Sequence, residues 1–292
     1  CELVAAKVPG KIKCNALPRA VSGAPGTFDA VRNGLADLSF TVHGYTPGRF
    51  VMPQMVEFPF MGDSSEVTSV AFQRMYAKVP AFADEHKGVK VLAVFTHGPG
   101  IIFNTKKPIT KADDVTGMKF RVGGGMVNEI SKAMGMNVTL KPAPESYELL
   151  STGVMDGTLF PAESVEGFKI DKVIKYATTF PGGLYNTSFV FMMNQAKYDS
   201  LPADLKKVID ANAGAAYSQA IGKIWDGSQA AGRQAAKDRG NTFTMIPASE
   251  LDNWVKAAAP LYDDFTADMD KKGLPGKQML QDARDLLVKY KK

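Results

Sequence analysis

At 292 residues the chain is long enough for one large domain or two lobes of ordinary size. Its residues are 45% hydrophobic and 22% charged, as in folded proteins, and no run approaches the ~20 apolar residues that a membrane-spanning helix needs. The net charge of +5 arises from basic residues scattered among acidic ones, without a basic run that contains aromatics. We therefore expect no nucleic-acid partner and no insertion into a membrane, whereas a basic surface suits the capture of anions.

Cysteines and histidines are too few for a structural zinc site. The cysteines are Cys1 and Cys14, which do not form a CxxC pair, and the histidines are His43, His86 and His97. A Cys1–Cys14 disulfide would require an oxidising compartment, so two unpaired thiols are our default expectation. We expect neither a metal nor a cofactor. No signal peptide is visible at the N-terminus, which lacks a basic segment followed by an apolar run.

Segments of strand and helix character alternate along the first two thirds of the chain. Apolar and β-branched runs predict strands at 11–17, 36–42, 89–95, 101–104, 118–122, 138–140, 156–160, 175–179 and 187–194. Helical periodicity predicts helices at 27–34, 64–78, 126–134 and 145–151, the first of them capped by Thr27 with Phe28, Val31 and Leu35 on one face. This alternation indicates an α/β fold with mostly parallel sheets that are covered on both faces.

From Pro202 onward the pattern is mainly helical. Pro202 is suited to the first turn of a long helical stretch. A short strand at 242–246 precedes a helix that starts near Ser249. The last helix follows Gly276 and ends in lysines, whose charge complements the helix dipole.

Motifs for nucleotide binding and nucleophilic catalysis are missing. The run Gly123-Gly124-Gly125 has neither the Walker ending nor the GxGxxG spacing, although a helix N-terminus there can present N–H groups to an anion. No GxSxG nucleophile elbow occurs. A small-molecule enzyme, such as a hydrolase or lyase that uses His97 or Glu163 as base, remains the alternative from another class. Without a nucleophile, His97 is better explained as a hydrogen-bonded loop residue.

Arg121 ends a predicted strand, and from composition alone it would be assigned to a surface or interlobe ion pair. The segment around it reads PITKADDVTGMKFRV over residues 108–122. Three further segments are FDAVRNGLADL at 28–38, PESYELL followed by GVMDG at 144–157, and MNQAKYDSLP at 193–202. In sequence and order these segments resemble the solute-binding proteins of TRAP transporters, the tripartite ATP-independent periplasmic carriers. The Lys-x-Arg and Asp-Gly segments favour this class over binding proteins of ATP-powered carriers.

The resemblance implies an α/β, two-lobed periplasmic-binding-protein-like fold, with a ligand cleft between lobes that are joined by several crossing strands and helices. Lobe I would comprise residues 1–98 and 186–225, and lobe II residues 99–185 and 226–292, with the C-terminal helices packing across both. The implied location is the bacterial periplasm, and the implied partners are a small organic acid and the membrane subunits of the transporter. Family members usually begin with a strand and most of a helix before the equivalent of Glu2, so this chain is expected to lack that strand.

The resemblance also implies a binding site. Arg121 would clamp the ligand carboxylate, because a planar guanidinium can bind a carboxylate through two parallel hydrogen bonds. Sialic-acid-binding members carry asparagine where this chain has Phe160, and their second arginine, near Ile101, is absent here. We therefore expect an aromatic or hydrophobic monocarboxylate or a 2-oxo acid, with a sugar acid as the alternative within the family. The remaining candidates for the lining are His43, Tyr45, His97, Glu163, Tyr185, Asn186 and Phe189.

Overall fold

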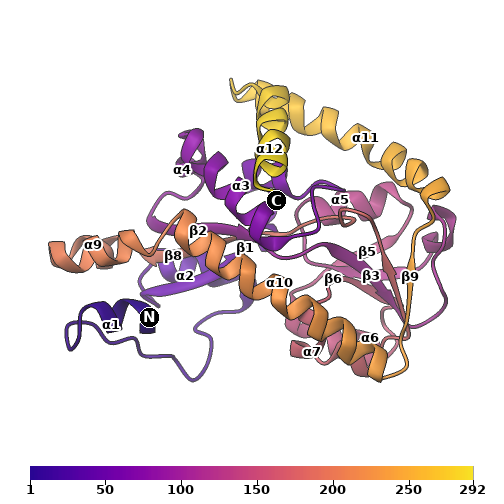
Figure 1. Cartoon of the computed structure of the whole chain (residues 1–292), viewed down its shortest axis with the longest axis horizontal. Helices are drawn as coiled ribbons and strands as arrows, with labels where there is room; N and C mark the ends of the chain where they lie inside the picture. Colours follow the sequence, from indigo (N-terminus) through magenta and orange to yellow (C-terminus); the bar gives the residue numbers. More distant parts are fainter. Residues whose placement is uncertain (292) are drawn as a thin grey trace.

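The computed structural model describes residues 1–291 and contains two β-sheets with helices packed around them (Figure 1). The small sheet has the strand order β1-β8-β2, with bounds Leu38–Val42, Ser188–Asn194 and Val89–Thr96. The large sheet has the order β5-β4-β6-β3-β7-β9, with bounds Asn137–Leu140, Lys119–Val122, Gly157–Pro161, Gly100–Asn104, Tyr176–Thr179 and Thr242–Met245. These strands confirm the predicted runs except the one at 11–17.

The prediction of mostly parallel sheets is wrong. Strand β8 is antiparallel to both of its neighbours in the small sheet, and β3 is antiparallel to both of its neighbours in the large sheet. Both strands follow a direct passage of the chain from one sheet to the other, without the covering helix that joins parallel neighbours. The alternation along the sequence does not reveal which sheet a strand joins, so it could not predict these directions.

The N-terminal segment corrects two further expectations. Residues 12–17 form no strand, because this mostly exposed segment pairs with neither sheet. Cys1 and Cys14 form a disulfide, so the expectation of two unpaired thiols is wrong. The chain turns back after helix α1 (Glu2–Lys7) and brings the two Cα atoms to 5.8 Å, within the range that a disulfide spans.

The shorter helices are α2 (Thr27–Arg32), α3 (Ser65–Lys78), α4 (Ala81–Glu85), α5 (Met126–Ala133), α6 (Ser146–Ser151), α7 (Ser164–Gly167), α8 (Gln195–Asp199) and α9 (Ala203–Ala211). Among them, α2, α3, α5 and α6 confirm the predicted helices with adjusted ends, α9 begins the helical stretch expected after Pro202, and α4, α7 and α8 were not predicted. Thr27 lies inside α2 and does not cap it. Because α2 ends at Arg32, Leu35 does not share its buried face and is 64% exposed.

Three long helices complete the fold, and one of them, α10 (Ala215–Asp238), spans from one sheet to the other (Figure 1). Helix α10 packs on α3 and β2 beside the small sheet and on α7 beside the large one. Helix α11 (Ala248–Lys271) contacts α5, and α12 (Gly276–Tyr290) contacts α3. One cluster of buried side chains extends across both regions and includes Val94, Phe120 and Trp254. The chain therefore forms two α/β lobes with continuous packing between them, while the exact lobe boundaries stay a prediction.

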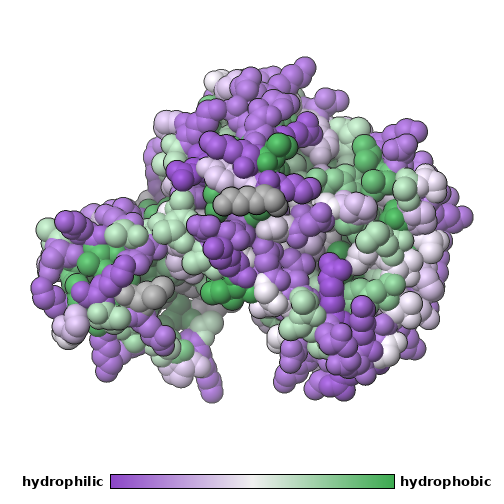
Figure 2. Space-filling model, viewed as in Figure 1, coloured by the Kyte–Doolittle hydropathy of each residue, from purple (hydrophilic) through white to green (hydrophobic). Residues whose placement is uncertain are grey.

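The surface of the described residues is largely hydrophilic on the face drawn in Figure 2, and it is indented between the N-terminal part and the part that carries α6 and α7. None of the described helices combines the length and the apolar character that a membrane crossing would need.

Candidate functional site

Arg121 lies at the centre of the candidate site. It is part of β4, between β5 and β6, and its side chain is buried, with the residue 2% exposed. Its Nε donates a hydrogen bond to Lys141 O at 2.7 Å, which orients the guanidinium. Among residues 1–291, no acidic side chain lies within ion-pair distance of it. A buried guanidinium is costly without an anionic partner, so this arrangement is suited to accept an acidic group.

The guanidinium lies over an aromatic ring that stacks on a second one. Phe160 lies on β6, and its ring centroid is 4.6 Å from the guanidinium carbon of Arg121. Phe160 also stacks on Phe168, with ring centroids 5.4 Å apart. A cation over an aromatic face is attracted by the ring quadrupole, and the rings exclude water. The sequence analysis chose Phe160 as a candidate for the ligand lining, and the structure places its ring against Arg121.

Two tyrosines from different parts of the chain approach the same arginine. Tyr45 follows β1 of the small sheet, and its Oη accepts a hydrogen bond from Ala143 N beside the large sheet, at 3.0 Å. Tyr185 packs over Gly100, where a Cβ atom would lie 2.2 Å from the ring, so that position requires glycine. Burial raises the pKa of Tyr185, although the charge of Arg121 opposes that shift, so its hydroxyl stays neutral.

His97 and Glu163 flank Tyr185. The His97 ring meets the Tyr185 ring edge to face, with centroids 5.4 Å apart, and its Nδ1 is hydrogen-bonded to Gly98 O. Burial lowers the pKa of His97 to about 4, which makes it neutral at physiological pH. Glu163 Oε1 accepts from Gly98 N at 2.8 Å, while Oε2 is buried and has no hydrogen-bond partner among the described residues. Burial raises the pKa of Glu163 to about 7.

Asn186 lies beside Tyr185 in the segment that crosses from the large sheet to the small one. It is 1% exposed, and neither Oδ1 nor Nδ2 has a partner within residues 1–291. Phe189, three residues further, stacks on Phe95 with centroids 5.2 Å apart and meets Trp225 edge to face. Phe189 therefore belongs mainly to an aromatic cluster beneath α10, and it reaches the other candidates through His97, at 6.1 Å between centroids.

His43 has both ring nitrogens engaged within the core. Its Nδ1 is 3.0 Å from Ser188 Oγ, and its Nε2 is 2.9 Å from Nε2 of His86. His86 Nδ1 donates to Phe82 O, because a carbonyl can only accept. The structure thus places His43 in a buried hydrogen-bond chain, whereas the other candidates gather around Arg121 and Tyr185.

Glu57, which the sequence analysis did not select, connects this chain to the Arg121 region. Its Oε1 accepts from Ser188 N at 2.9 Å and from Ser188 Oγ at 2.5 Å, and its Oε2 accepts from Met126 N at 2.8 Å. The helix N-terminus after the glycine run therefore binds a carboxyl group, which is a side chain of the same protein. The signal in the sequence was an acidic residue alone among apolar neighbours at 52–61.

The lobes touch directly next to this carboxylate. A Cβ atom on Gly44, which follows β1, would lie 2.5 Å from the backbone carbon of Gly124, which follows β4. Only glycine permits this contact of two backbones. The contact and the bridge through Glu57 fix the loop that follows Arg121 against the small sheet.

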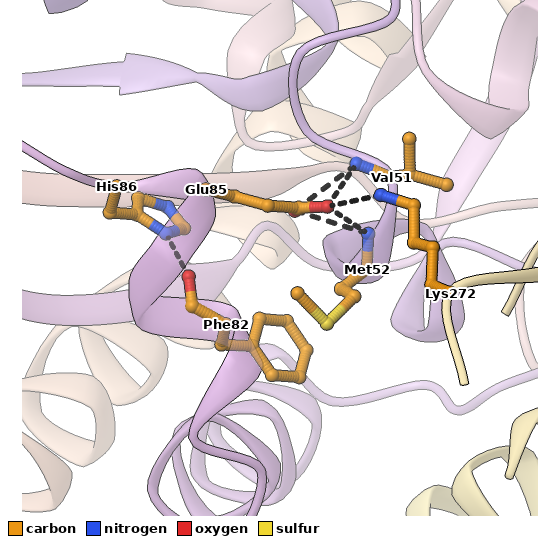
Figure 3. A network of polar contacts seen from close by, with 6 residues as sticks. All are labelled: Val51, Met52, Phe82, Glu85, His86 and Lys272. Atoms are coloured by element: carbon orange, nitrogen blue, oxygen red, sulfur yellow. Dashed lines mark hydrogen bonds and ion pairs between the residues drawn. The ribbon is translucent and has the colours of Figure 1, made fainter. Parts of the chain in front are cut away.

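A second carboxylate supports the segment that carries Glu57. Glu85 accepts hydrogen bonds from Val51 N and Met52 N, at the start of the short helix Met52–Val56, and Lys272 Nζ lies 3.3 Å from it (Figure 3). Its neighbour His86 bonds Phe82 in the same view. The segment 51–57 is therefore held by a carboxylate at each end. Glu85 also lines a surface pocket that includes none of the nine candidate residues.

Two α/β lobes with a continuous core and a buried arginine are the architecture of a two-lobed solute-binding protein. The family profile of bacterial extracellular solute-binding proteins, family 7 (DctP), matches residues 1–268. The chain belongs to this family, the solute-binding proteins of TRAP transporters, which are transport components rather than enzymes. The alternatives of a hydrolase or lyase and of an ATP-powered carrier are thereby set aside.

Solved structures of similar chains support the assignment. A TRAP periplasmic solute-binding protein from Bordetella bronchiseptica with bound (R)- and (S)-mandelate is 37% identical, with a TM-score of 0.95 over 99% of this chain and 91% of that one. A marine metagenome protein specific for aromatic acids, with 3-hydroxybenzoate, is 39% identical, with a TM-score of 0.94 over 100% and 92%. A protein from Rhodoferax ferrireducens with copurified benzoate is 34% identical, with a TM-score of 0.94 over 99% and 91%.

Proposed function

We propose that this chain captures an aromatic monocarboxylate in the periplasm and delivers it to the membrane subunits of a TRAP transporter. The observation that carries the proposal is the buried Arg121 guanidinium, which has no acidic partner among the described residues and stacks on Phe160. A ligand carboxylate supplies the missing negative charge and accepts two parallel hydrogen bonds from the guanidinium. The Cys1–Cys14 disulfide is consistent with an oxidising compartment such as the periplasm.

The aromatic character of the ligand follows from what surrounds the arginine. The rings of Phe160, Phe168 and Tyr185 supply apolar surface next to the charge. An aromatic ligand ring stacked there gains about 0.5–1.5 kcal/mol beyond the burial of its area. A sugar acid needs hydrogen-bond partners for several hydroxyls, and among these rings only Tyr185 carries a polar group. The three similar structures at 34–39% identity, each named with an aromatic acid, support the same class.

Lobe closure completes the binding. Tyr45 and Gly44 come from the small-sheet side, and Ala143 and Gly124 from the large-sheet side, so their contacts form together. Closing removes water from around Arg121, which strengthens its attraction for a carboxylate. Part of that attraction offsets the desolvation of both ions and the ordering of the ligand. In this scheme Tyr45, His97, Glu163, Tyr185, Asn186 and Phe189 line or support the ligand site around Arg121, and His43 acts through Ser188 and Glu57.

Isothermal titration calorimetry tests the proposal. Benzoate, mandelate, glucuronate and 2-oxobutanoate are titrated into protein that has been unfolded, dialysed free of copurified ligand and refolded. We expect at least one aromatic acid to bind near ~1 μM, which corresponds to about −8 kcal/mol, and glucuronate to bind far more weakly. Tight binding of glucuronate with no response to any aromatic acid would refute the proposal. Mass spectrometry after incubation should return the acid chemically unchanged.

A further inference from the structure

Asn186 has more unused hydrogen-bonding capacity than any other buried side chain in the described part of the molecule. Single side-chain atoms lack a partner in a few residues, such as Asn104 and Trp254, but Asn186 lacks one for both its oxygen and its nitrogen. A buried polar group without a partner costs about 1–3 kcal/mol. An amide that is fully buried in this way points to a polar group that arrives with a ligand.

The backbone around Asn186 is held by hydrogen bonds to two other segments, which fixes the point from which its side chain projects. Gly100 N donates to Tyr185 O at 2.8 Å, and His97 N donates to Thr187 O at 3.4 Å. On the opposite side Asn186 N donates to Glu57 O at 3.4 Å. The crossing segment 185–187 is thus fixed between the candidate loop at 97–100 and the Glu57 bridge.

Asn186 lies within the same region as the proposed carboxylate clamp. The preceding residue, Tyr185, is close enough to Arg121 for the guanidinium charge to favour ionisation of its hydroxyl. Two residues further, Ser188 bonds Glu57, whose other oxygen caps the helix that begins just after Arg121 and the glycine run. The residues before and after Asn186 in the chain, Tyr185 and Ser188, therefore each connect to the region around Arg121.

The chemistry of an amide selects the class of group that it would bind. Its oxygen accepts a hydrogen bond and its nitrogen donates, so a hydroxyl, which both donates and accepts, can pair with either end. A second carboxylate would pair with the nitrogen alone and leave the oxygen facing negative charge. A purely apolar ligand surface would leave both atoms unpaired. Among aromatic acids, those that carry a hydroxyl suit this residue best.

We propose that Asn186 is a specificity-determining residue, which binds a hydroxyl group of the acid that Arg121 anchors. This inference rests on the proposed function and narrows its ligand class to hydroxylated aromatic monocarboxylates. The discrimination arises because binding the unhydroxylated parent acid leaves the buried amide unpaired, which is the most effective way for a site to reject an analogue.

The test compares each parent acid with its hydroxylated forms by calorimetry. The pairs are benzoate with 2-, 3- and 4-hydroxybenzoate, and phenylacetate with the two enantiomers of mandelate. We expect at least one hydroxylated acid to bind wild-type protein about tenfold more tightly than its parent, or about 1.4 kcal/mol. In Asn186→Leu, which keeps the volume but removes both polar atoms, we expect that preference to fall below about threefold with the parent affinity retained.

Thr187→Val is the matched control, since it removes one polar group from the adjacent buried position and should keep the preference. Binding of the parent acid to Asn186→Leu shows that this variant is folded. The inference is overturned if wild-type protein has no hydroxyl preference, if Asn186→Leu keeps it, or if Asn186→Leu weakens parent and hydroxylated acids equally. If no aromatic acid binds wild-type protein, the proposed function fails, and this inference fails with it.

Discussion

Replacement of Arg121 by methionine separates the two energetic roles of a buried charge. Methionine has a similar length but neither charge nor donors. The unliganded protein loses the Nε bond to Lys141 O, worth about 1 kcal/mol, and the contact with Phe160, worth about 1–2 kcal/mol. It also no longer has to bury an unpaired guanidinium, which costs several kcal/mol. We therefore expect Arg121→Met to be as stable as wild type when no ligand is present, or more stable.

Ligand binding should respond in the opposite way. The loss of one partner of a buried charge pair costs about 3–5 kcal/mol, or roughly a hundred- to several-thousand-fold in affinity. At a ligand concentration of one hundred times the wild-type Kd, binding stabilises wild-type protein by about 2.7 kcal/mol. For a chain of this size that stabilisation raises Tm by roughly 5 °C. A variant with thousandfold weaker binding gains less than about 0.1 kcal/mol and shows no measurable shift.

The assay is thermal unfolding followed by circular dichroism, with and without mandelate or hydroxybenzoate. Arg49→Met is the control, because Arg49 is also partly buried, over the Phe28 ring at 4.0 Å, but it already pairs with Asp29 at 2.8 Å and lies outside the site. That variant should lose stability and keep the ligand shift. An undiminished shift in Arg121→Met, or a loss of more than about 2 kcal/mol in its unliganded stability, contradicts the assigned role.

Three further changes have defined outcomes. Phe160→Leu removes the ring that contacts Arg121 and stacks on Phe168, so aromatic acids should bind about two- to tenfold more weakly by calorimetry while 2-oxobutanoate is unaffected. Equal weakening of both kinds of acid would count against stacking. Burial raises the pKa of Glu163 from 4.5 to about 7, so its contribution to stability is complete below pH 4.5 and is lost as the pH rises through 7. In urea unfolding, the stability of the wild type relative to Glu163→Gln should therefore fall by about 2 kcal/mol between pH 5 and 8. A difference that stays constant over this range would refute the raised pKa of Glu163. The buried histidines, whose pKa values are lowered, are common to both proteins and cancel in the comparison. Glu57→Gln leaves the N–H of Met126 or a Ser188 donor unpaired, so urea unfolding should show a free energy of unfolding that is lower by about 1–3 kcal/mol. An unchanged midpoint of urea unfolding would exclude a bridging role for Glu57.

The local elements could be predicted from the sequence because their signals are short-range. The strand at β4 and the helix at α5 follow from apolar periodicity, and their observed bounds differ from the expected ones by about a residue. Arg121 was selected from the order of four segments along the chain and Phe160 from its place before Pro161, and the fold brings the guanidinium carbon of Arg121 to 4.6 Å from the Phe160 ring centroid. Such motifs are recognised by the order of residues along the chain, so they can be found without knowledge of the tertiary contacts.

Long-range pairing could not be predicted in the same way. No periodicity indicates that Glu57 bonds Ser188, since 131 positions separate them, or that Gly44 faces Gly124. The expected strand at 11–17 failed for the same reason, because a strand exists only where a neighbouring strand accepts its hydrogen bonds. The candidates were therefore a mixture of residues that lie near Arg121, such as Tyr185, and residues engaged in the core, such as His43.

The sequence by itself determined the succession of strands and helices, the family and the choice of Arg121 as the central candidate residue. These depend on which residues stand near one another along the chain. Only the tertiary structure decided the directions of β3 and β8, the disulfide, and which buried polar atoms are left without a partner. The physical reason is that burial and hydrogen-bond satisfaction belong to pairs of distant segments, and the identity of such a pair is settled when the two lobes pack together.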